Sequence, residues 1–152
     1  MPKQLVVFGL AEELYGLDIF DVREVIKDAP ITKIPNAPEF VEGVVNLRGK
    51  IIPVIDLKKR FGIGKGEKSK DSRIIIVEIS GQEAGLIVDS VDEVITIDDN
   101  SIEPAPPVTT INAAFIEGLA KKEDKLIILI KLDLLLDAEK KEVLKNISQQ
   151  VN

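Results

Sequence analysis

The sequence contains no histidine, no cysteine and no tryptophan among its 152 residues. These absences exclude a cysteine nucleophile, a Ser-His-Asp triad and a zinc site built from histidine and cysteine. They also exclude a disulfide framework, so the apolar core has to supply the stability of the fold. Carboxylates are the only plausible acid–base groups that remain.

Aromatic side chains and positive charge are scarce as well. The chain has five Phe and one Tyr, and its 20 basic and 26 acidic residues give a formal charge of −6. Proteins that bind nucleic acid use basic patches and aromatic platforms for base stacking. The composition therefore argues against nucleic acid as a partner, while its 45% of apolar and 30% of charged residues are typical of a globular protein.

Long hydrophobic runs are missing too. The longest apolar runs, residues 5–8 and 126–130, are far shorter than the roughly 20 residues that a membrane-spanning helix needs. Residues 1–4 lack the pattern of a signal peptide. We therefore expect a cytoplasmic protein.

Short runs rich in Val and Ile alternate with Gly, Pro, Asp and Asn along most of the chain. Many of these runs are apolar at nearly every position, which is typical of strands covered on both faces or closed into a small barrel. They predict strands at residues 5–10, 13–19, 43–45, 51–55, 73–79, 84–88, 94–97 and 126–131.

Helical spacing of apolar residues occurs in three places. Residues 138–150 predict a C-terminal helix, which Asp137 can cap. Shorter helical turns are predicted over residues 20–27 and 57–61. In the first of these turns the aliphatic residues on one side are Val22, Val25 and Ile26.

Two parts of the sequence resemble each other. Residues 16–26 match residues 85–95 at an offset of 69 (85 − 16), and residues 40–43 match 115–118 at an offset of 75 (115 − 40). Two matches in the same order indicate a duplicated unit of roughly 65–70 residues, although short Val, Ile and Glu strings also recur by chance. One such unit buries little apolar surface, and two units packed through a shared apolar seam would solve that problem.

The sequence therefore predicts an all-β fold of two small barrels side by side, each with about five strands, together with the C-terminal helix. We expect residues 12–79 to form the first barrel. Residues 80–137, together with an N-terminal strand over residues 4–10, would form the second, and the helix would follow at 138–150. The whole chain, residues 1–152, would be a single domain.

The carboxylates favour structural roles over catalysis. Asp98 and Asp99 are adjacent, so in a strand they would point to opposite faces, and with Asn100 they predict a turn. Asp18 and Asp56 stand at strand boundaries, where capping a turn is the ordinary role. A small carboxylate-dependent hydrolase would need paired acids that converge in a cavity, and the sequence shows no such spacing. We expect no metal and no cofactor.

Residues 38–57 are the most informative segment, because two apolar strands there flank a tight connection. Gly49 would supply the backbone freedom of the turn, and Asn46 can hydrogen-bond to its own backbone. Arg48 then projects from the tip. It is either a solubilising turn residue or an anchor for a carboxylate of a partner, since a guanidinium is planar and always charged.

This segment resembles the signature of the CheW family, the bacterial chemotaxis coupling proteins. The resemblance extends from about residue 4 to residue 148, which is nearly the whole chain. Its most specific part is Asn46-Leu47-Arg48-Gly49 with the residues that follow it, 51–57. The other similar segments are, in order, residues 15–19, 22–25, 34–35, 85–91 and 118–119.

The resemblance implies an adaptor without enzymatic activity and without a cofactor. Members of the family have two five-stranded SH3-like barrels, and they join transmembrane chemoreceptors to the histidine kinase CheA. The implied partners are therefore the regulatory domain of CheA and the cytoplasmic tip of a chemoreceptor, with the membrane reached only through receptors. A regulatory-type SH3-like domain of a kinase in another two-component pathway is the alternative.

The resemblance also implies site residues by position. The helical tip of the receptor would lie in a groove between the barrels, whose lining residues would be Val6, Ile19, Val22, Val25 and Val91. Three further residues match positions associated with receptor or kinase coupling: Glu24, Gly43 and Arg48. Val22 and Val91 are equivalent under the offset of 69, as a pseudo-symmetric apolar trough requires. Each of these aliphatic residues could equally belong to the core.

Overall fold

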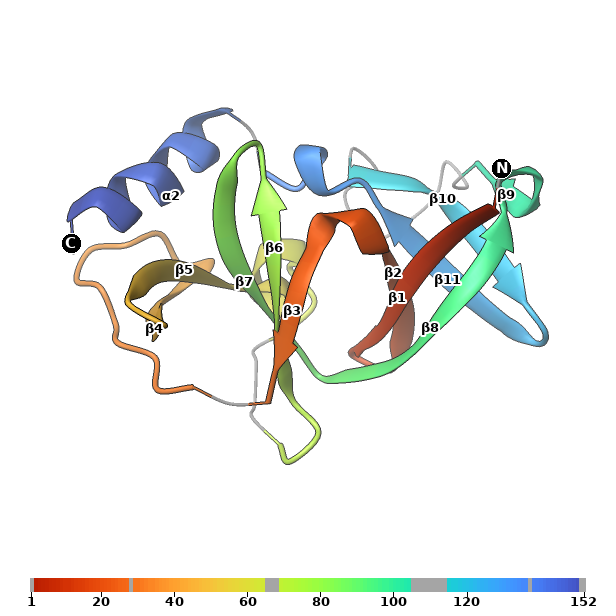
Figure 1. Ribbon diagram of the computed structural model, residues 1–152, viewed down its shortest axis with the longest axis horizontal. Helices are drawn as coiled ribbons and strands as arrows, with labels where there is room; N and C mark the ends of the chain where they lie inside the picture. Colours follow the sequence, from red (N-terminus) through yellow and green to blue (C-terminus); the bar gives the residue numbers. More distant parts are fainter. Residues whose placement is uncertain (1, 28, 65–68, 105–114, 137, 151–152) are drawn as a thin grey trace.

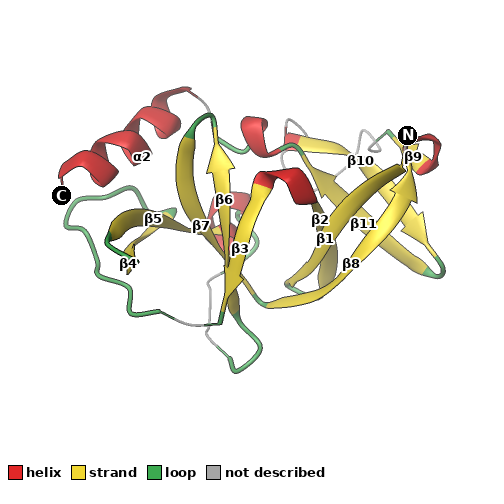
Figure 2. Cartoon of the chain, viewed as in Figure 1, coloured by secondary structure: helices red, strands yellow, loops and turns green. Residues whose placement is uncertain are grey.

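The computed structural model describes residues 2–27, 29–64, 69–104, 115–136 and 138–150 (Figure 1). Strands dominate these residues, and the all-β prediction is confirmed (Figure 2). The strands are β1 (Pro2–Leu10), β2 (Glu13–Asp18), β3 (Val22–Ile26), β4 (Val41–Leu47), β5 (Lys50–Asp56), β6 (Arg73–Ile79), β7 (Gln82–Val88), β8 (Ser90–Asp98), β9 (Ile102–Glu103), β10 (Ile116–Lys122) and β11 (Lys125–Ile130). The helices are α1 (Leu57–Phe61) and α2 (Ala138–Gln150), with 3-10 helices η1 (Ile19–Asp21), η2 (Asp99–Ser101) and η4 (Leu132–Leu134).

The strands form two sheets that lie next to each other along the length of the molecule (Figure 1). One sheet has six strands in the order β8-β1-β2-β11-β10-β9, and the other has five in the order β3-β6-β7-β5-β4. Helix α2 packs against β5 and β7 of the five-stranded sheet. No helix among the described residues is both long and apolar enough to cross a membrane.

The sheet order follows the internal repeat of the sequence. Under the two offsets, the strands β1, β2, β3, β4 and β5 correspond to β6, β7, β8, β10 and β11. Replacing each strand by its counterpart turns the order β3-β6-β7-β5-β4 into β8-β1-β2-β11-β10, which is the observed six-stranded sheet without β9. The topology therefore supports the duplication that the sequence indicates.

The two repeats exchange strands. Each sheet takes one hairpin, β1–β2 or β6–β7, from one repeat and its remaining strands from the other. Each hairpin joins the strands of the other repeat on both sides, by an antiparallel pairing (β1 with β8, β6 with β3) and by a parallel one, with Gly16 opposite Leu129 and Gly85 opposite Val54. The boundaries 12–79 and 80–137 therefore do not coincide with the sheets, because β2 lies in the six-stranded sheet and β7 in the five-stranded one.

The predicted helices differ in their outcome. Residues 57–61 form α1, and Oδ1 of Asp56 caps it by accepting from the backbone N of Lys58 at 3.0 Å. The C-terminal helix is confirmed over 138–150, whereas its predicted cap, Asp137, lies outside the described residues. The helical turn over 20–27 is wrong, because η1 there gives way to the strand β3.

A β-bulge explains this error. Val22 lies opposite Val77 and Glu24 lies opposite Ile76, so Arg23 is the extra residue of the bulge. The extra residue lets Val22 and Val25, three positions apart, point to the same face of β3. In a sequence this spacing resembles one side of a helix.

The largest cluster of buried side chains spans both sheets, and we call it the central core. The rings of Phe8, Tyr15, Phe61 and Phe115 run through it in sequence, with centroid distances of 5.8, 5.7 and 4.6 Å. The burial of Tyr15 in this core, followed by the charge of Glu13, raises the pKa of its hydroxyl to about 12. The central core is the apolar seam through which two small units stabilise each other.

Candidate partner-binding site

The outer strands β3 and β8 carry two pairs of valines, Val22 and Val25 on one and Val91 and Val94 on the other. The pairs correspond to each other under the offset of 69. Val22 and Val91 are half-buried against the central core, whereas Val25 is 41% and Val94 is 53% exposed. We call these four residues the valine quartet. β3 and β8 are edge strands of different sheets; in Figure 1, β3 crosses the middle of the molecule, and β8 runs from below it to the end where the N-terminus lies.

Three residues of the quartet point to the side of the central core. Residues opposite each other in an antiparallel pair share a face of the sheet. Val22 and Val25 lie opposite Val77 and Ile75, and Val91 and Val94 lie opposite Phe8 and Val6. Val77, Ile75 and Phe8 belong to the central core. Val22, Val25 and Val91 therefore lie on the faces of the two edge strands that adjoin the central core, and Val94 lies three residues beyond Val91 on the same strand.

The structure brings the five predicted groove residues into this neighbourhood. Val22, Val25 and Val91 belong to the quartet, Val6 is buried opposite Val94, and Ile19 is half-buried in η1 just before β3. Sequence reasoning missed Val94. The offset of 69 applied to Val25 would have found it.

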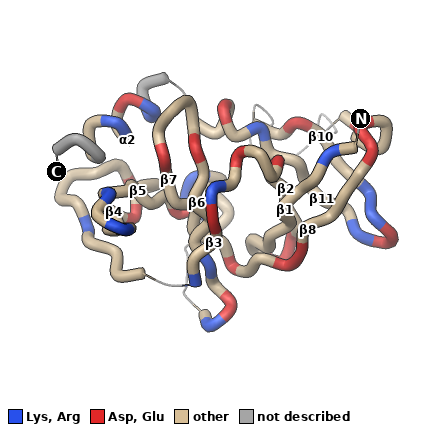
Figure 3. Tube along the Cα trace, in the orientation of Figure 1, with Lys and Arg blue, Asp and Glu red and all other residues tan. Residues whose placement is uncertain are grey.

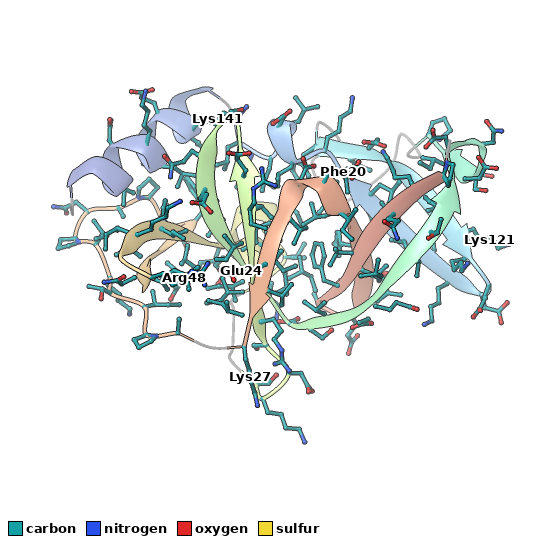
Figure 4. All side chains as sticks on the ribbon, viewed as in Figure 1. Phe20, Glu24, Lys27, Arg48, Lys121 and Lys141 are labelled. Atoms are coloured by element: carbon teal, nitrogen blue, oxygen red, sulfur yellow. The ribbon has the colours of Figure 1, made fainter. Side chains whose placement is uncertain are left out.

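Two of the predicted coupling residues contact each other (Figure 4). Nη2 of Arg48 donates to Oε1 of Glu24 at 2.6 Å, and Nη1 donates to Oε2 at 3.4 Å. The hydrogen bond and the charge of Glu24 raise the pKa of Arg48 above its ordinary value. The side chain of Arg48 is still 73% exposed. The pair therefore ties the tip of the β4–β5 hairpin to β3 and leaves the guanidinium within reach of a partner.

The backbone of the hairpin fixes the position of Arg48. Arg48 has φ 52° and Gly49 has φ 85°, as a two-residue turn matched to the twist of the strands requires. Oδ1 of Asn46 accepts from the backbone N of Gly49 at 3.0 Å, which confirms the predicted role of Asn46. Arginine seldom occupies this left-handed conformation.

Gly43, the third predicted coupling residue, is buried near the start of β4, away from the Arg48 turn at its end. A Cβ at Gly43 would lie 2.3 Å from the carbonyl O of Thr32, which accepts from the backbone N of Val44 at 2.9 Å. In the other repeat, a Cβ at Gly118 would lie 2.5 Å from the carbonyl O of Glu103. Both glycines thus allow a neighbouring segment of backbone to pack closely.

A cavity of about 320 Å³ lies elsewhere in the fold, and sequence reasoning missed it. Its charged lining residues are Asp18, Asp21, Glu117 and Asp133 with Lys3 and Lys131. Nζ of Lys3 is 2.9 Å from Glu117 and 4.0 Å from Asp18. Burial, followed by the charges of Asp18 and Asp133, raises the pKa of Asp21 above its ordinary value. The four carboxylates come from four elements, so no spacing in the sequence links them.

Asp18 and Asp89 have structural partners. Oδ1 of Asp18 accepts from the backbone N of Phe20 at 3.0 Å, which confirms the predicted capping role. Oδ1 of Asp89 pairs with Nζ of Lys58 at 2.8 Å, and its Oδ2 accepts from the backbone N of Ala11 at 2.9 Å. In the part of the chain that the structure describes, no group of three or more acidic residues is placed to hold a metal ion.

Comparison with known proteins identifies the family. A family model described as CheW-like domain matches residues 4–140. The chain is 35% identical to the chemotaxis protein CheW of Treponema pallidum, with 95% of this chain and 88% of the relative covered. It is 34% identical to CheW of Bacillus subtilis, with 90% and 88% covered.

A solved structure is more similar still. The scaffolding protein TtCheW from Thermoanaerobacter tengcongensis is 75% identical and superposes with a TM-score of 0.84, over 91% of this chain and 90% of that one. The family match, the curated relatives and the shared fold give one result. The chain belongs to the CheW family of chemotaxis proteins, which act as scaffolds and not as enzymes.

Proposed function

We propose that this chain couples transmembrane chemoreceptors to the histidine kinase CheA by binding both at once. The observation that carries the proposal is the valine quartet. Exposed aliphatic side chains on two edge strands leave apolar surface in water, which a bound partner would remove. The chain contributes no chemical step, and its activity is to hold the partners in a fixed relation.

The quartet suits the helical tip of a receptor. An amphipathic helix docks by laying its apolar stripe on a complementary apolar surface. Val25 and Val94 supply the exposed part of that surface, and Val22 and Val91 continue it towards the central core. Val6 lies opposite Val94, and Ile19 precedes β3. These residues make up the proposed receptor surface.

The pair of Arg48 and Glu24 links the proposed receptor surface to the β4–β5 hairpin, because Glu24 lies on the same strand as Val22 and Val25. We assign the pair to coupling between receptor and kinase. Gly43 supports the same hairpin from inside, by admitting the segment around Thr32. The second partner is the regulatory domain of CheA, and the protein works in the cytoplasm at membrane receptor arrays. Affinities near micromolar would suit an array of many weak contacts.

The first prediction tests the receptor surface. Val25→Glu and Val94→Glu each place a charge where the apolar helix would lie, so each should weaken binding of a receptor tip fragment about tenfold or more. Because both valines are exposed, the melting temperature should stay close to that of the wild type. Binding is measured by calorimetry with purified fragments.

Leu126→Glu is the matched control, because Leu126 is 57% exposed on β11 and does not belong to the quartet. It should leave receptor binding unchanged. Undiminished binding by both valine variants would refute the receptor surface. Kinase binding by the same variants shows whether the two partners use separate surfaces.

A further inference from the structure

Phe20 differs from every other aromatic residue of the chain. The other four Phe and the Tyr are buried, with exposed fractions of 8% or less, whereas Phe20 is 83% exposed. A large exposed aromatic side chain costs hydration free energy in the free protein, and aromatic rings are enriched among the anchors of protein interfaces. Phe20 lies in η1, at the upper end of β3 in Figure 4.

The backbone that carries this ring is held on both sides. Oδ1 of Asp18 accepts from the N of Phe20 at 3.0 Å, and Nη1 of Arg23 donates to its carbonyl O at 3.1 Å. The guanidinium of Arg23 is itself paired with Glu78. A ring on a fixed backbone loses less conformational entropy on binding than a ring on a free loop.

The surroundings of Phe20 are acidic. Asp18 and Asp21, two and one residues away from it, line the cavity described above together with Asp133 and the half-exposed Leu134. Figure 3 shows acidic residues in η1 and η4, the two short helices concerned. Four carboxylates and two lysines line this cavity, so a partner that brings a cationic side chain would relieve the repulsion between the carboxylates.

This cavity and the valine quartet use different faces of β1. Lys3 and Leu5 line the cavity, whereas Val6 lies opposite Val94 of the quartet. Successive residues of a strand point to opposite faces of the sheet. A scaffold that joins two partners needs two such surfaces.

We propose that Phe20 and Leu134 form a second docking surface, for a folded protein partner whose apolar recess is flanked by Lys or Arg side chains. The proposal rests on the proposed function, since it assigns this surface to the partner that the quartet does not hold. Phe20 enters the recess, and the carboxylates around it select the basic partner. Of the two proposed partners, the kinase regulatory domain is the one expected here.

The test compares the full-length wild type with Phe20→Ala and Asp133→Lys, and with Leu126→Ala as a control at another exposed apolar residue. Binding to the kinase regulatory domain and to the receptor tip fragment is measured separately by calorimetry, at low and at high salt. Phe20→Ala and Asp133→Lys should each weaken kinase binding about tenfold and leave receptor binding unchanged. Kinase binding by the wild type should also weaken with salt.

Four results would overturn the inference. If Phe20→Ala binds the kinase domain as strongly as the wild type does, Phe20 is not an anchor. If Phe20→Ala loses receptor binding, Phe20 belongs to the quartet surface instead. An equal loss in Leu126→Ala makes the effect unspecific. A wild-type chain that binds neither fragment overturns the proposed function and this inference together, whereas the first three leave the proposed function standing. Melting temperatures no lower than that of the wild type confirm that the fold of the variants is intact.

Discussion

At the scale of single residues, Arg48 combines a contact within the chain with a largely exposed side chain. Its guanidinium is bound by Glu24 of the same chain, as expected of a residue that braces the fold, and most of its surface is still in water, as expected of an anchor. Exposed ion pairs contribute little to the free energy of unfolding. The value of this pair therefore lies in where it holds the hairpin and not in how much it stabilises the protein.

Arg48→Ala should accordingly abolish kinase activation in reconstituted complexes while changing the melting temperature by no more than about 2 °C. Lys50→Ala is the matched control, because Lys50 is 73% exposed like Arg48, belongs to the same hairpin and pairs with Glu83 at 3.0 Å. Lys50→Ala should keep kinase activation. Equal activation by both variants would contradict the coupling role of Arg48.

Asp21 gives a pH-dependent prediction. Burial and the charges of Asp18 and Asp133 raise its pKa in the folded state above the unfolded value. Protonation of Asp21 then favours folding, so its contribution to stability is present below the unfolded pKa and is lost as the pH rises through the folded pKa. Asp21→Asn removes this titration.

The melting temperature of Asp21→Asn should therefore exceed that of the wild type at pH 7, and the difference should shrink as the pH falls below the ordinary pKa of an aspartate. Thermal unfolding followed by circular dichroism across this pH range measures the difference. A constant difference at all pH values would exclude Asp21 as its source.

At the scale of elements, the sequence predicts regular strands well and bulged ones poorly. Residues 73–79 and 51–55 are almost continuously apolar and were predicted as strands, which β6 and β5 confirm. β3 was predicted as a helical turn, since its bulge puts Val22 and Val25 on one face at a spacing of three. A bulge arises from the pairing with another strand, and the isolated segment carries no sign of it.

The site shows the same limit. The family resemblance led to Arg48 and Glu24 as separate residues, and their ion pair depends on the packing of β3 beside the β4–β5 hairpin. Asp18 and Asp56 were predicted as caps because capping is local to a few residues. The acidic cavity beside Phe20 combines four elements, so no local pattern could predict it.

Gly43 and Gly118 allow a prediction at this scale. Both directly follow the bulge of the first strand of a hairpin, and at each a Cβ would come closer than 2.6 Å to a backbone carbonyl O, that of Thr32 or Glu103. Gly43→Ala and Gly118→Ala should therefore each lower the free energy of unfolding by about 1–3 kcal/mol, because a backbone segment has to move. Urea unfolding measures the loss.

Gly49→Ala is the control for these variants. Gly49 has φ 85°, but nothing lies within 4 Å of a Cβ placed there, so its loss should be limited to the cost of a left-handed conformation, about 1 kcal/mol. If Gly43→Ala and Gly49→Ala cost the same, the close approach of Thr32 carries no energetic weight.

At the scale of the whole molecule, the duplication of the sequence does not by itself determine how the two copies share their strands between the sheets. The offsets of 69 and 75 are visible in the sequence and predict two equivalent units. The exchange of the β1–β2 and β6–β7 hairpins between sheets is not visible there, because a strand keeps the same apolar pattern in either sheet. The predicted boundaries placed the N-terminal strand with the second barrel, as the structure does, but they kept β2 with the first barrel and β7 with the second.

The exchange predicts how the molecule behaves when its repeats are separated. A fragment of residues 1–66 holds β1 to β5, yet β1 pairs with β8, β2 with β11, β3 with β6 and β5 with β7 of the other fragment. Each fragment alone would leave these edges unpaired and its share of the central core exposed. We therefore expect neither 1–66 nor 67–152 to show cooperative unfolding alone. An equimolar mixture should recover the far-ultraviolet circular dichroism of the intact chain and sediment as a one-to-one complex.

The mixture is also the control for cutting the chain, because it carries the same cut as the single fragments. Cooperative unfolding of 1–66 alone would mean that a repeat can close its own sheet, and the exchange would then be a consequence of the linkage and not of the pairing preferences of the strands.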